Sequence, residues 1–289
     1  MNIFKYWAKY QEIIPVKNWV NPLSGKQKDI APTYNFIGGS NISEREALVA
    51  AKEKRNRIKA IISGNPLDDT DYEVDIVEEI ITTIDEDNIV TRNRYGALVL
   101  NSAHLMFVDI DNSQFRHSYF FKTGILTLLK NSFIKISLDE KIENHIAKIA
   151  SKTKHQNHSF RIYKTPAGYR VIVIGEKFVA KSKEAQKILS SFGSDWLYKL
   201  LCKKQNCFRA RLTPKPHRIK IKRHRVIFPF RTVDEEKIHQ NWVSNYENKS
   251  GMYAACKFIR EIGKKNYSEL EIVKYHDRKC NALSSKTIA

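Results

Sequence analysis

The sequence predicts an α/β protein of the α+β kind, with a mixed or antiparallel sheet flanked by helices. Its 289 residues are 42% hydrophobic, which is enough to bury a sizeable core. Apolar, β-branched runs such as "LMFVDI" and "YRVIVI" are typical of strands, and stretches of charged helix formers separate them. We therefore divide the chain into a mainly helical region at 1–89, a core of strands and helices at 90–233, and a helical region at 234–289 that packs on the core.

The N-terminal region is expected to contain two helices. Residues 1–40 mix aromatic residues with Pro and Gly and predict irregular or short extended structure. Ser43 and Glu46 form a capping box for a helix that Gly64 can end. After a turn at "NPLDDTD", the apolar residues of 72–87 recur with a helical period, which predicts a second, acidic helix.

The core is expected to contain a strand–helix–strand–strand unit. The run "NIVTRNRYGALVL" and the run "LMFVDID" flank "NSAH", which predicts a hairpin or adjacent strands. A helix at 137–154 follows, and then two strands that a Pro-Ala-Gly turn joins. Two short helices broken at Gly193 are expected at 181–204, basic strands interrupted by prolines at 208–230, and helix at about 234–270.

Charge favours a polyanionic partner. Lys and Arg number 50 against 31 Asp and Glu, so the formal charge is +19, and nucleic acid is the partner this excess favours. The longest apolar runs fall far short of the roughly 20 residues that span a bilayer, and the first residues lack the apolar segment of a signal peptide. We expect a cytoplasmic protein without a membrane partner, whose four cysteines are reduced thiols or ligands.

Two acids stand at the end of a buried strand. Asp109 and Asp111 occupy positions i and i+2, so their carboxylates share one face, about 6.5 to 7 Å apart along the strand. Carboxylates in this arrangement can share one or two Mg²⁺ or Mn²⁺ ions, which suit hard oxygen ligands. The alternative is a strand that ends in a turn, where Asp and Asn are common.

The predicted hairpin at 160–175 gathers groups that bind phosphate. Its tight turn places Lys164, Thr165, the backbone around Gly168, and Arg170 near one another, and such a group can bind a triphosphate. The alternative is an ordinary hairpin with a solvated Lys and Arg.

Together these motifs resemble the archaeo-eukaryotic primase and primase-polymerase superfamily over residues 90–231. The shared pattern is a hydrophobic-Asp-hydrophobic-Asp strand, a helix, and a strand–turn–strand with a basic residue after the glycine turn. The resemblance implies an RRM-like palm as the catalytic core, with Asp109 and Asp111 as ligands of the catalytic metals. Arg170 stands where the family has a histidine that touches the nucleotide's phosphates, and an arginine can also bond phosphate.

The resemblance further implies a third acid and a basic contact segment. Asp195 is the candidate acid, although it can instead cap the helix that follows it. The predicted nucleotide- and phosphate-binding residues are Lys164, Thr165, Gly168, Arg170, Arg209, Arg211 and Lys215. Diguanylate cyclases carry a similar "DIDxF" strand, but the Gly-Gly-Asp/Glu-Glu-Phe hairpin that they need is absent here.

The most charge-dense stretch is "RARLTPKPHRIKIKRHR". A strand through "RIKIKRH" would project a row of cations that tracks a phosphate backbone, although solvated basic strands also occur without a ligand. The predicted nucleic-acid contacts are Arg92, Arg94, Lys220, Lys222, Arg223 and Arg225, with Tyr95 able to stack on a base.

Two further groups of residues have metal-binding or orienting chemistry. Cys202, Cys207, His217 and His224 can hold Zn²⁺, or they are packed thiols beside histidines of the basic surface. His276 and Asp277 in "YHDRK" are either an orienting pair or an exposed helix end.

The leading hypothesis is a metal-dependent nucleotidyltransferase that resembles a primase-polymerase and acts on nucleoside triphosphates and DNA or RNA. It would use two Mg²⁺ or Mn²⁺ ions held by Asp109, Asp111 and Asp195. One alternative is a non-catalytic nucleic-acid-binding protein on the same fold. Another is a two-metal nuclease or RNA-processing enzyme, because two-metal phosphoryl chemistry runs in either direction.

Overall fold

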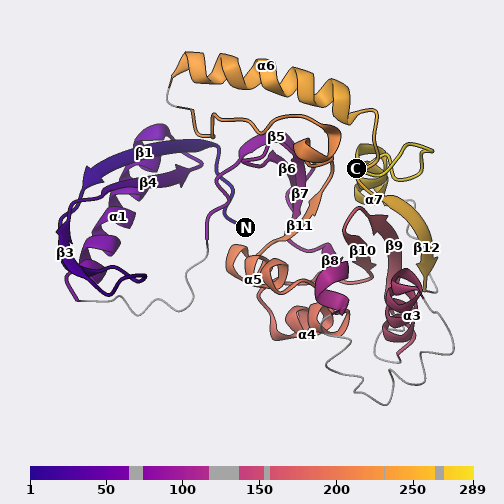
Figure 1. The fold of residues 1–289 in the computed structure, drawn as a ribbon. Coiled ribbons are helices and arrows are strands. Elements are labelled where there is room, and N and C mark those ends of the chain that lie inside the picture. Colours follow the sequence, from indigo (N-terminus) through magenta and orange to yellow (C-terminus); the bar gives the residue numbers. More distant parts are fainter. Residues whose placement is uncertain (65–73, 117–136, 153–156, 231, 264–269) are drawn as a thin grey trace.

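The computed structural model describes residues 1–64, 74–116, 137–152, 157–230, 232–263 and 270–289. These residues form antiparallel sheets flanked by helices, which confirms the predicted α+β class (Figure 1). An N-terminal part with α1 (Glu44–Ile62) lies at one end of the molecule, and α3 (Leu138–Ala150) lies at the other.

The first four-stranded sheet carries the candidate acids. Its order is β12 (Lys257–Ile262), β9 (Ser159–Thr165), β10 (Gly168–Ile174) and β8 (Met106–Asp111), with every pair antiparallel. The predicted helix at 137–154 is α3, and the predicted Pro-Ala-Gly hairpin is β9–β10. The predicted strand–helix–strand–strand unit is therefore present as β8, α3, β9 and β10.

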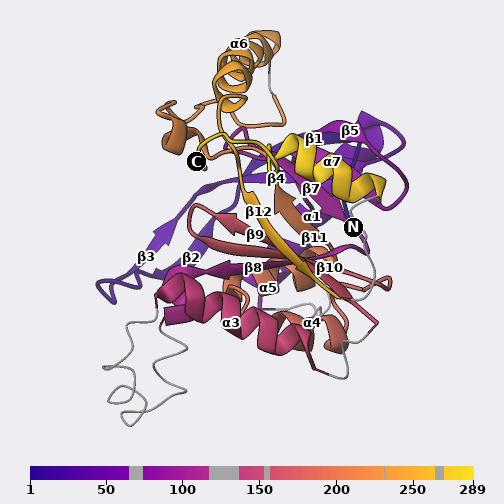
Figure 2. The same ribbon diagram turned by 90° about the vertical axis from the view of Figure 1, so that its right-hand side faces the viewer.

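The two faces of this sheet have different covers. Helices α3 and α4 (Lys183–Ser191) cover one face, where the Tyr169 hydroxyl hydrogen-bonds Glu143 of α3 and Phe160 packs on Phe192 (Figure 2). Helix α7 (Glu271–Lys279) covers part of the other face, with His276 against Tyr163. Asp109 and Asp111 lie on this second face, because Ile110 between them pairs with Tyr169, whose side chain points to α3.

A second four-stranded sheet stands beside the first. Its order is β11 (Phe208–Arg211), β7 (Leu98–Ser102), β6 (Asn88–Arg92) and β5 (Glu79–Thr83). The hairpin is thus β6–β7, and the hairpin or adjacent pair predicted across "NSAH" is wrong, because β7 and β8 belong to different sheets. Ser102 turns the chain between them by accepting the backbone N–H of Leu105 at 2.9 Å.

The N-terminal region is mainly strand, and the mainly helical prediction for 1–89 is wrong. Strands β1 (Tyr6–Ile13) and β4 (Thr33–Ser40) pair and support α1, while β2 (Val16–Val20) pairs with β3 (Gln27–Ile30). The predicted cap of α1 is confirmed, since Ser43 accepts the Glu46 N–H at 3.2 Å. The helix predicted at 72–87 is wrong for the described residues 74–87, which are irregular apart from strand β5, because the β-branched run "IITT" pairs with β6.

The basic and C-terminal segments also differ from prediction. The helices around Gly193 are confirmed as α4 and α5 (Trp196–Gln205). After β11 the basic segment forms a short 3₁₀ helix at Pro216–Ile219 and irregular chain, not the predicted strands, because its prolines lack the N–H that a ladder needs. The predicted C-terminal helix ends at Ser250 as α6 (Val233–Ser250), and β12 follows at the sheet edge.

No helix among the described residues is long and apolar enough to cross a membrane.

Gly168 sets how closely the β9–β10 turn approaches β8. A Cβ there would lie 1.9 Å from the Ile110 carbonyl oxygen, so no other residue fits without moving the backbone. We expect Gly168→Ala to lower the free energy of unfolding by about 1–3 kcal/mol, as overpacking does. The measurement is urea unfolding. Gly251→Ala is the control, because its Cβ would meet nothing closer than 3.5 Å; equal stability of the two variants would contradict this packing.

Candidate functional site

A cleft of about 760 Å³ lies between the two four-stranded sheets. Asp109 and Asp111 of β8 line it, and so do Thr165 and Arg170 from the β9–β10 hairpin. Strand β11 and the segment after it add Arg209, Arg211, Lys215 and Arg218. The fold therefore brings two of the three predicted acids and most of the predicted phosphate contacts into one cavity.

Asp109 is a half-buried carboxylate without a hydrogen-bonding partner. Its side chain makes no hydrogen bond or ion pair within the described residues. Burial raises the pKa of Asp109, and the nearby cations Arg170 and Arg211 only partly offset this effect. A carboxylate that is desolvated and unpaired is costly as an anion, so a bound cation would stabilise it.

Asp111 has a better-satisfied carboxylate. Its Oδ1 accepts the Ser113 hydroxyl and the Ser113 N–H, the latter at 2.8 Å, at the start of the helical residues 112–116. Burial alone would raise the pKa of Asp111, but these hydrogen bonds lower it below its usual value. Asp111 is thus an anion at neutral pH on the same face of β8 as Asp109.

Asp195 lies next to Asp109 but outside the cleft lining. Its backbone N–H donates to the Asp109 carbonyl at 2.8 Å. Its carboxylate caps α5 by accepting the Tyr198 N–H at 2.7 Å, and it also bonds the Gln114 amide. The structure therefore shows the capping alternative for Asp195, and its role as a third metal ligand stays a prediction.

The cleft also holds cations that no described acid pairs. Arg211, Lys215 and Arg218 form no ion pair within the described residues. Burial and the charge of Arg170 lower the pKa of Arg211 to about 10, and burial and Arg211 lower the pKa of Lys215. Burial likewise lowers the pKa of Arg218. Because these groups repel one another and form no ion pair with the described acids, an anion in the cleft would stabilise all of them.

Arg170 lies between the cleft and the protein interior. It is directly opposite Asp109 in the β8–β10 ladder and is only 7% exposed. Its Nη1 donates to the Arg211 carbonyl at 2.9 Å and to His276 Nε2 at 3.1 Å. Burial would lower the pKa of Arg170, but Cys256, Cys280 and Asp109 raise it overall.

Three predicted contacts have other partners. Lys164 points to the opposite face of the sheet, where it pairs with Asp139 of α3 and lies over the Tyr169 ring. Arg209 lines the cleft but pairs with Glu78 and donates to Asn101 at 2.7 Å. Arg92 is 5% exposed and pairs with Glu247 at 2.6 Å. Lys164 and Arg92 therefore have structural contacts where surface or phosphate contacts were expected.

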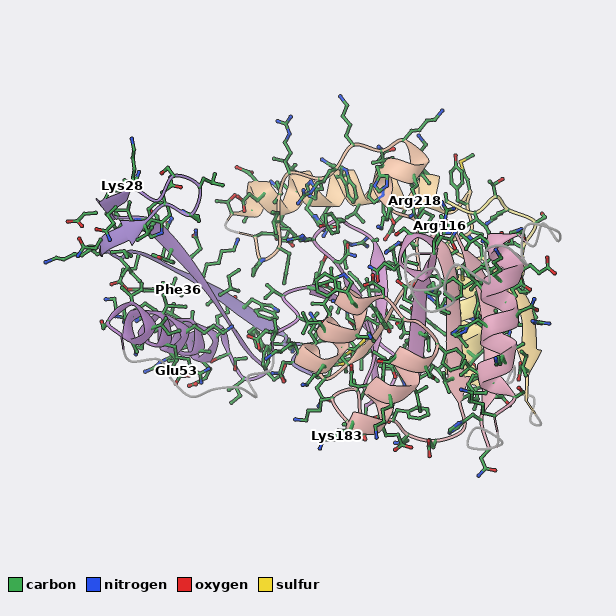
Figure 3. All side chains as sticks on the ribbon, turned by 60° about the horizontal axis from the view of Figure 1, so that its bottom comes forward. Lys28, Phe36, Glu53, Arg116, Lys183 and Arg218 are labelled. Carbon is green, nitrogen blue, oxygen red and sulfur yellow. The ribbon has the colours of Figure 1, made fainter. Side chains whose placement is uncertain are left out.

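The remaining predicted nucleic-acid contacts are accessible. Arg94 lies over Tyr95, and so does Arg223, with guanidinium-to-ring distances of 4.9 and 5.0 Å. The segment after the 3₁₀ helix contains four exposed cations, which are Lys220, Lys222, Arg223 and Arg225. Arg218 precedes them, and other cations such as Lys28 and Lys183 project from distant elements (Figure 3).

The predicted zinc set is not gathered. Cys202 and Cys207 are buried near α5, whereas His224 stacks on Trp242 of α6. His217 lies in the 3₁₀ helix and is exposed. All four cysteines of the chain are free and buried.

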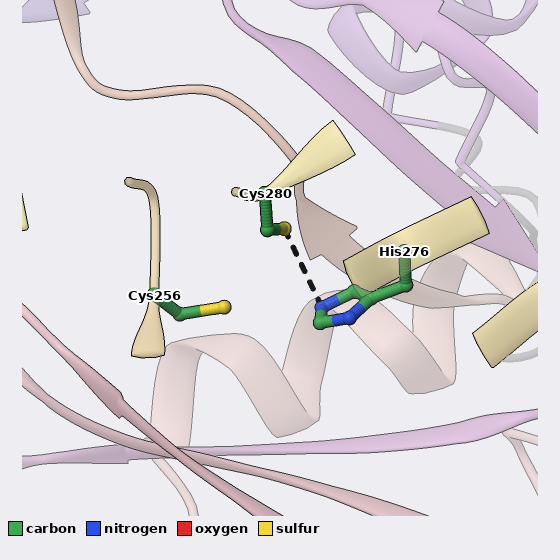
Figure 4. A group of neighbouring side chains, drawn as sticks. All are labelled: Cys256, His276 and Cys280. Atoms are coloured by element: carbon green, nitrogen blue, oxygen red, sulfur yellow. Dashed lines mark hydrogen bonds between the residues drawn. The ribbon is translucent and has the colours of Figure 1, made fainter. Parts of the chain in front are cut away.

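A different cluster forms behind the cleft. Cys256, His276 and Cys280 place their ligand atoms within 4.8 Å of one another, and no other such group of three occurs in the described part of the chain (Figure 4). The exposed-helix-end interpretation of "YHDRK" is wrong, because His276 and Asp277 are buried and bonded to each other at 3.0 Å. His276 and Asp277 do form a hydrogen-bonded pair, and the spacing His276-x3-Cys280 is the sequence signal that could have pointed to the cluster.

No family model, no curated protein and no solved structure matches this chain.

Substitution of Arg211 and of Arg209, both on β11, tests whether the cleft cations without an ion pair bind phosphate. We expect Arg211→Gln to weaken nucleoside triphosphate binding by about 10- to 100-fold, since a hydrogen bond to a charged group contributes roughly 1.5–3 kcal/mol. Its free energy of unfolding should stay unchanged or rise, because a half-buried cation that Arg170 repels is removed. Titration calorimetry and urea unfolding measure the two effects.

Arg209→Gln is the matched control two residues away. It should leave triphosphate affinity unchanged and lower the free energy of unfolding by about 1–3 kcal/mol, because it leaves buried Glu78 without its cation. Equal losses of triphosphate affinity in both variants would contradict the distinction.

Proposed function

We propose that this protein is a metal-dependent nucleotidyltransferase of the primase-polymerase kind, acting on nucleoside triphosphates and nucleic acid. One observation carries the proposal. Asp109 is desolvated and unpaired in the same cleft as Arg211, Lys215 and Arg218, which are also unpaired. An unpaired carboxylate can bind a metal ion and the unpaired cations can bind phosphates, so the cleft suits a metal–triphosphate complex.

The donor set suits Mg²⁺ or Mn²⁺. Asp109 and Asp111 offer carboxylate oxygens from one strand face, and Asp109 has no competing hydrogen bond in the described part of the chain. These two residues would hold the ions, with Asp195 as the proposed third ligand. Bound ions would supply charge neutralisation and orientation for phosphoryl transfer.

The cationic residues would bind the substrate's phosphates. Arg211 and Lys215 approach the cleft from the β11 side, and Thr165 with the turn at Gly168 approaches from the hairpin side. Arg170 is directly opposite Asp109, so one cross-strand pair presents both signs of charge. Groups fixed in advance around a triphosphate would stabilise the charge that develops during transfer.

The exposed basic segment would bind the nucleic-acid strand. Lys222, Arg223 and Arg225 follow the cleft residue Arg218 along the chain, and Arg223 lies over Tyr95 at the cleft. An aromatic ring beside cations is the arrangement that binds single strands through stacking and phosphate contacts.

A second candidate is a non-catalytic nucleic-acid-binding protein. The observation that favours it is the hydrogen bonding of Asp111 and Asp195, since each carboxylate already accepts backbone N–H groups at the start of a helical segment. In that case only Asp109 lacks a structural explanation.

Substitution of the two acids distinguishes the candidates. We expect Asp109→Asn and Asp111→Asn each to lower nucleotide incorporation by about 10²-fold or more, the loss typical when one preorganised electrostatic group is removed. Binding of the oligonucleotide should persist, because the basic segment is unchanged. The measurement is extension of labelled oligonucleotides with Mg²⁺ or Mn²⁺, together with a binding assay.

Asp139→Asn is the matched control, because Asp139 is an acid on the opposite side of the same sheet. Its incorporation should equal that of the unmodified chain. Shortened products without extension would indicate a nuclease. Neither extension nor cleavage with either metal would reject catalysis and leave the binding protein.

A further inference from the structure

We propose that Cys256, His276 and Cys280 form a zinc site in the wall behind the cleft. Two thiols and an imidazole are the ligand types of protein zinc sites. Their ligand atoms lie within 4.8 Å of one another, and all three residues are fully buried. The proposal does not depend on the nucleotidyltransferase activity.

The distance between the Cys280 sulfur and the His276 nitrogen fits two ligands of a tetrahedral zinc ion. Cys280 Sγ lies 3.6 Å from His276 Nε2. Zinc bonds of about 2.3 Å to sulfur and 2.0–2.1 Å to nitrogen, at a tetrahedral angle, would separate these two atoms by about 3.6 Å. His276 and Cys280 reach this spacing because Cys280, the C-cap of α7, follows His276 by four residues and keeps helical backbone angles.

The histidine is held in the form that binds metal. Its Nδ1 lies 3.0 Å from the Asp277 carboxylate, which can only accept a hydrogen bond once ionised. Its Nε2 receives an N–H from Arg170, which can only donate. The proton therefore belongs on Nδ1, and Nε2, whose lone pair accepts the Arg170 N–H, lies 3.6 Å from Cys280 Sγ. A carboxylate behind a histidine is the usual outer partner of a zinc ligand.

Asp277 is itself fixed in place. Arg161 donates to its Oδ2 at 2.6 Å, and the Tyr163 hydroxyl donates to its Oδ1 at 2.6 Å. Both partners come from β9, so the orientation of His276 is tied to the first sheet. Such a chain of hydrogen bonds behind the histidine is typical of metal sites, and an accidental cluster of two thiols and an imidazole would not need it.

Arg170 and zinc would compete for the same lone pair. Nη1 of Arg170 lies 3.1 Å from His276 Nε2 and 3.9 Å from Cys280 Sγ. The guanidinium therefore lies where the zinc ion would contact these two ligands. Zinc binding would require Nη1 to leave Nε2, while its bond to the Arg211 carbonyl can remain. Two thiolates would neutralise the Zn²⁺ charge, which lowers the free-energy cost of burying the ion beside a guanidinium.

The ion would join two parts of the fold, and a third lies against the cluster. Cys256 precedes β12, His276 belongs to α7, and Cys280 is the C-cap of α7. The carbonyl of Arg211, at the end of β11, lies 3.7 Å from Cys280 Sγ. A zinc ion here would fasten the C-terminal segments to the sheet that carries Asp109.

Metal analysis of the full chain tests the site. The purified protein, stripped with chelator and given Zn²⁺, should retain about one ion per chain after gel filtration. Co²⁺ in its place should give a thiolate-to-cobalt charge-transfer band in the near ultraviolet and the visible bands of a tetrahedral ion. Both readouts use the unmodified protein, so they do not rely on a variant that folds.

Substitutions then assign the ligands. His276→Asn and Cys280→Ser should abolish retention of the ion, and Asp277→Asn should weaken zinc affinity by about 10- to 100-fold. The double variant Cys202→Ser/Cys207→Ser is the control and should retain the ion, because these buried thiols lie outside the cluster. The proposal is wrong if the unmodified chain keeps no zinc and gives no cobalt charge-transfer band. It is equally wrong if the control loses the ion and the Cys280 variant keeps it.

Discussion

The antiparallel pairing of β8 with β10 is the constraint on which the candidate site depends. Its register sets Asp109 opposite Arg170 and Asp111 opposite Gly168. Because side chains alternate along a strand, a slip of one residue would turn both acids toward α3 and α4, into the apolar core. Gly168 holds this register by its contact with the Ile110 carbonyl, since no side chain fits there. The geometry of the acids is thus fixed by backbone packing.

Arg170 connects the two regions that this pairing creates. On the cleft side it faces Asp109, and on the interior side it bonds His276 next to the two thiols. One buried cation therefore lies between a carboxylate, whose charge it only partly offsets, and a cluster of lone-pair donors. Arg170 also donates a hydrogen bond to the Arg211 carbonyl, while the Arg211 guanidinium forms no ion pair with a described acid in the cleft. This distribution of charge is the basis of the proposed metal–triphosphate complex in the cleft and of the proposed zinc ion at the cluster.

Local signals predicted much of the fold, and long-range contacts determined the remainder. The Ser43 cap, α3 and the β9–β10 turn were readable because each depends on residues a few positions apart. Strand β5 was mistaken for a helix because its apolar residues also fit a helical period, and only pairing with β6 decides between them. Sequence could not distinguish Arg209 from Arg211, since the acid that pairs with Arg209 is 131 positions away. The thiol cluster was missed because Cys256 and α7 meet only in the folded chain, and neighbours in sequence were chosen instead.

The most direct measurement is Mn²⁺ binding by the unmodified chain and by Asp109→Asn, in the presence of a nucleoside triphosphate. Electron paramagnetic resonance of the free ion reports how much Mn²⁺ the protein removes from solution. The charge distribution in the cleft predicts that the unmodified chain depletes the free Mn²⁺ signal beyond what the triphosphate alone removes, and that Asp109→Asn loses this extra depletion. Equal depletion by both proteins, or none by either, would contradict a metal site at Asp109.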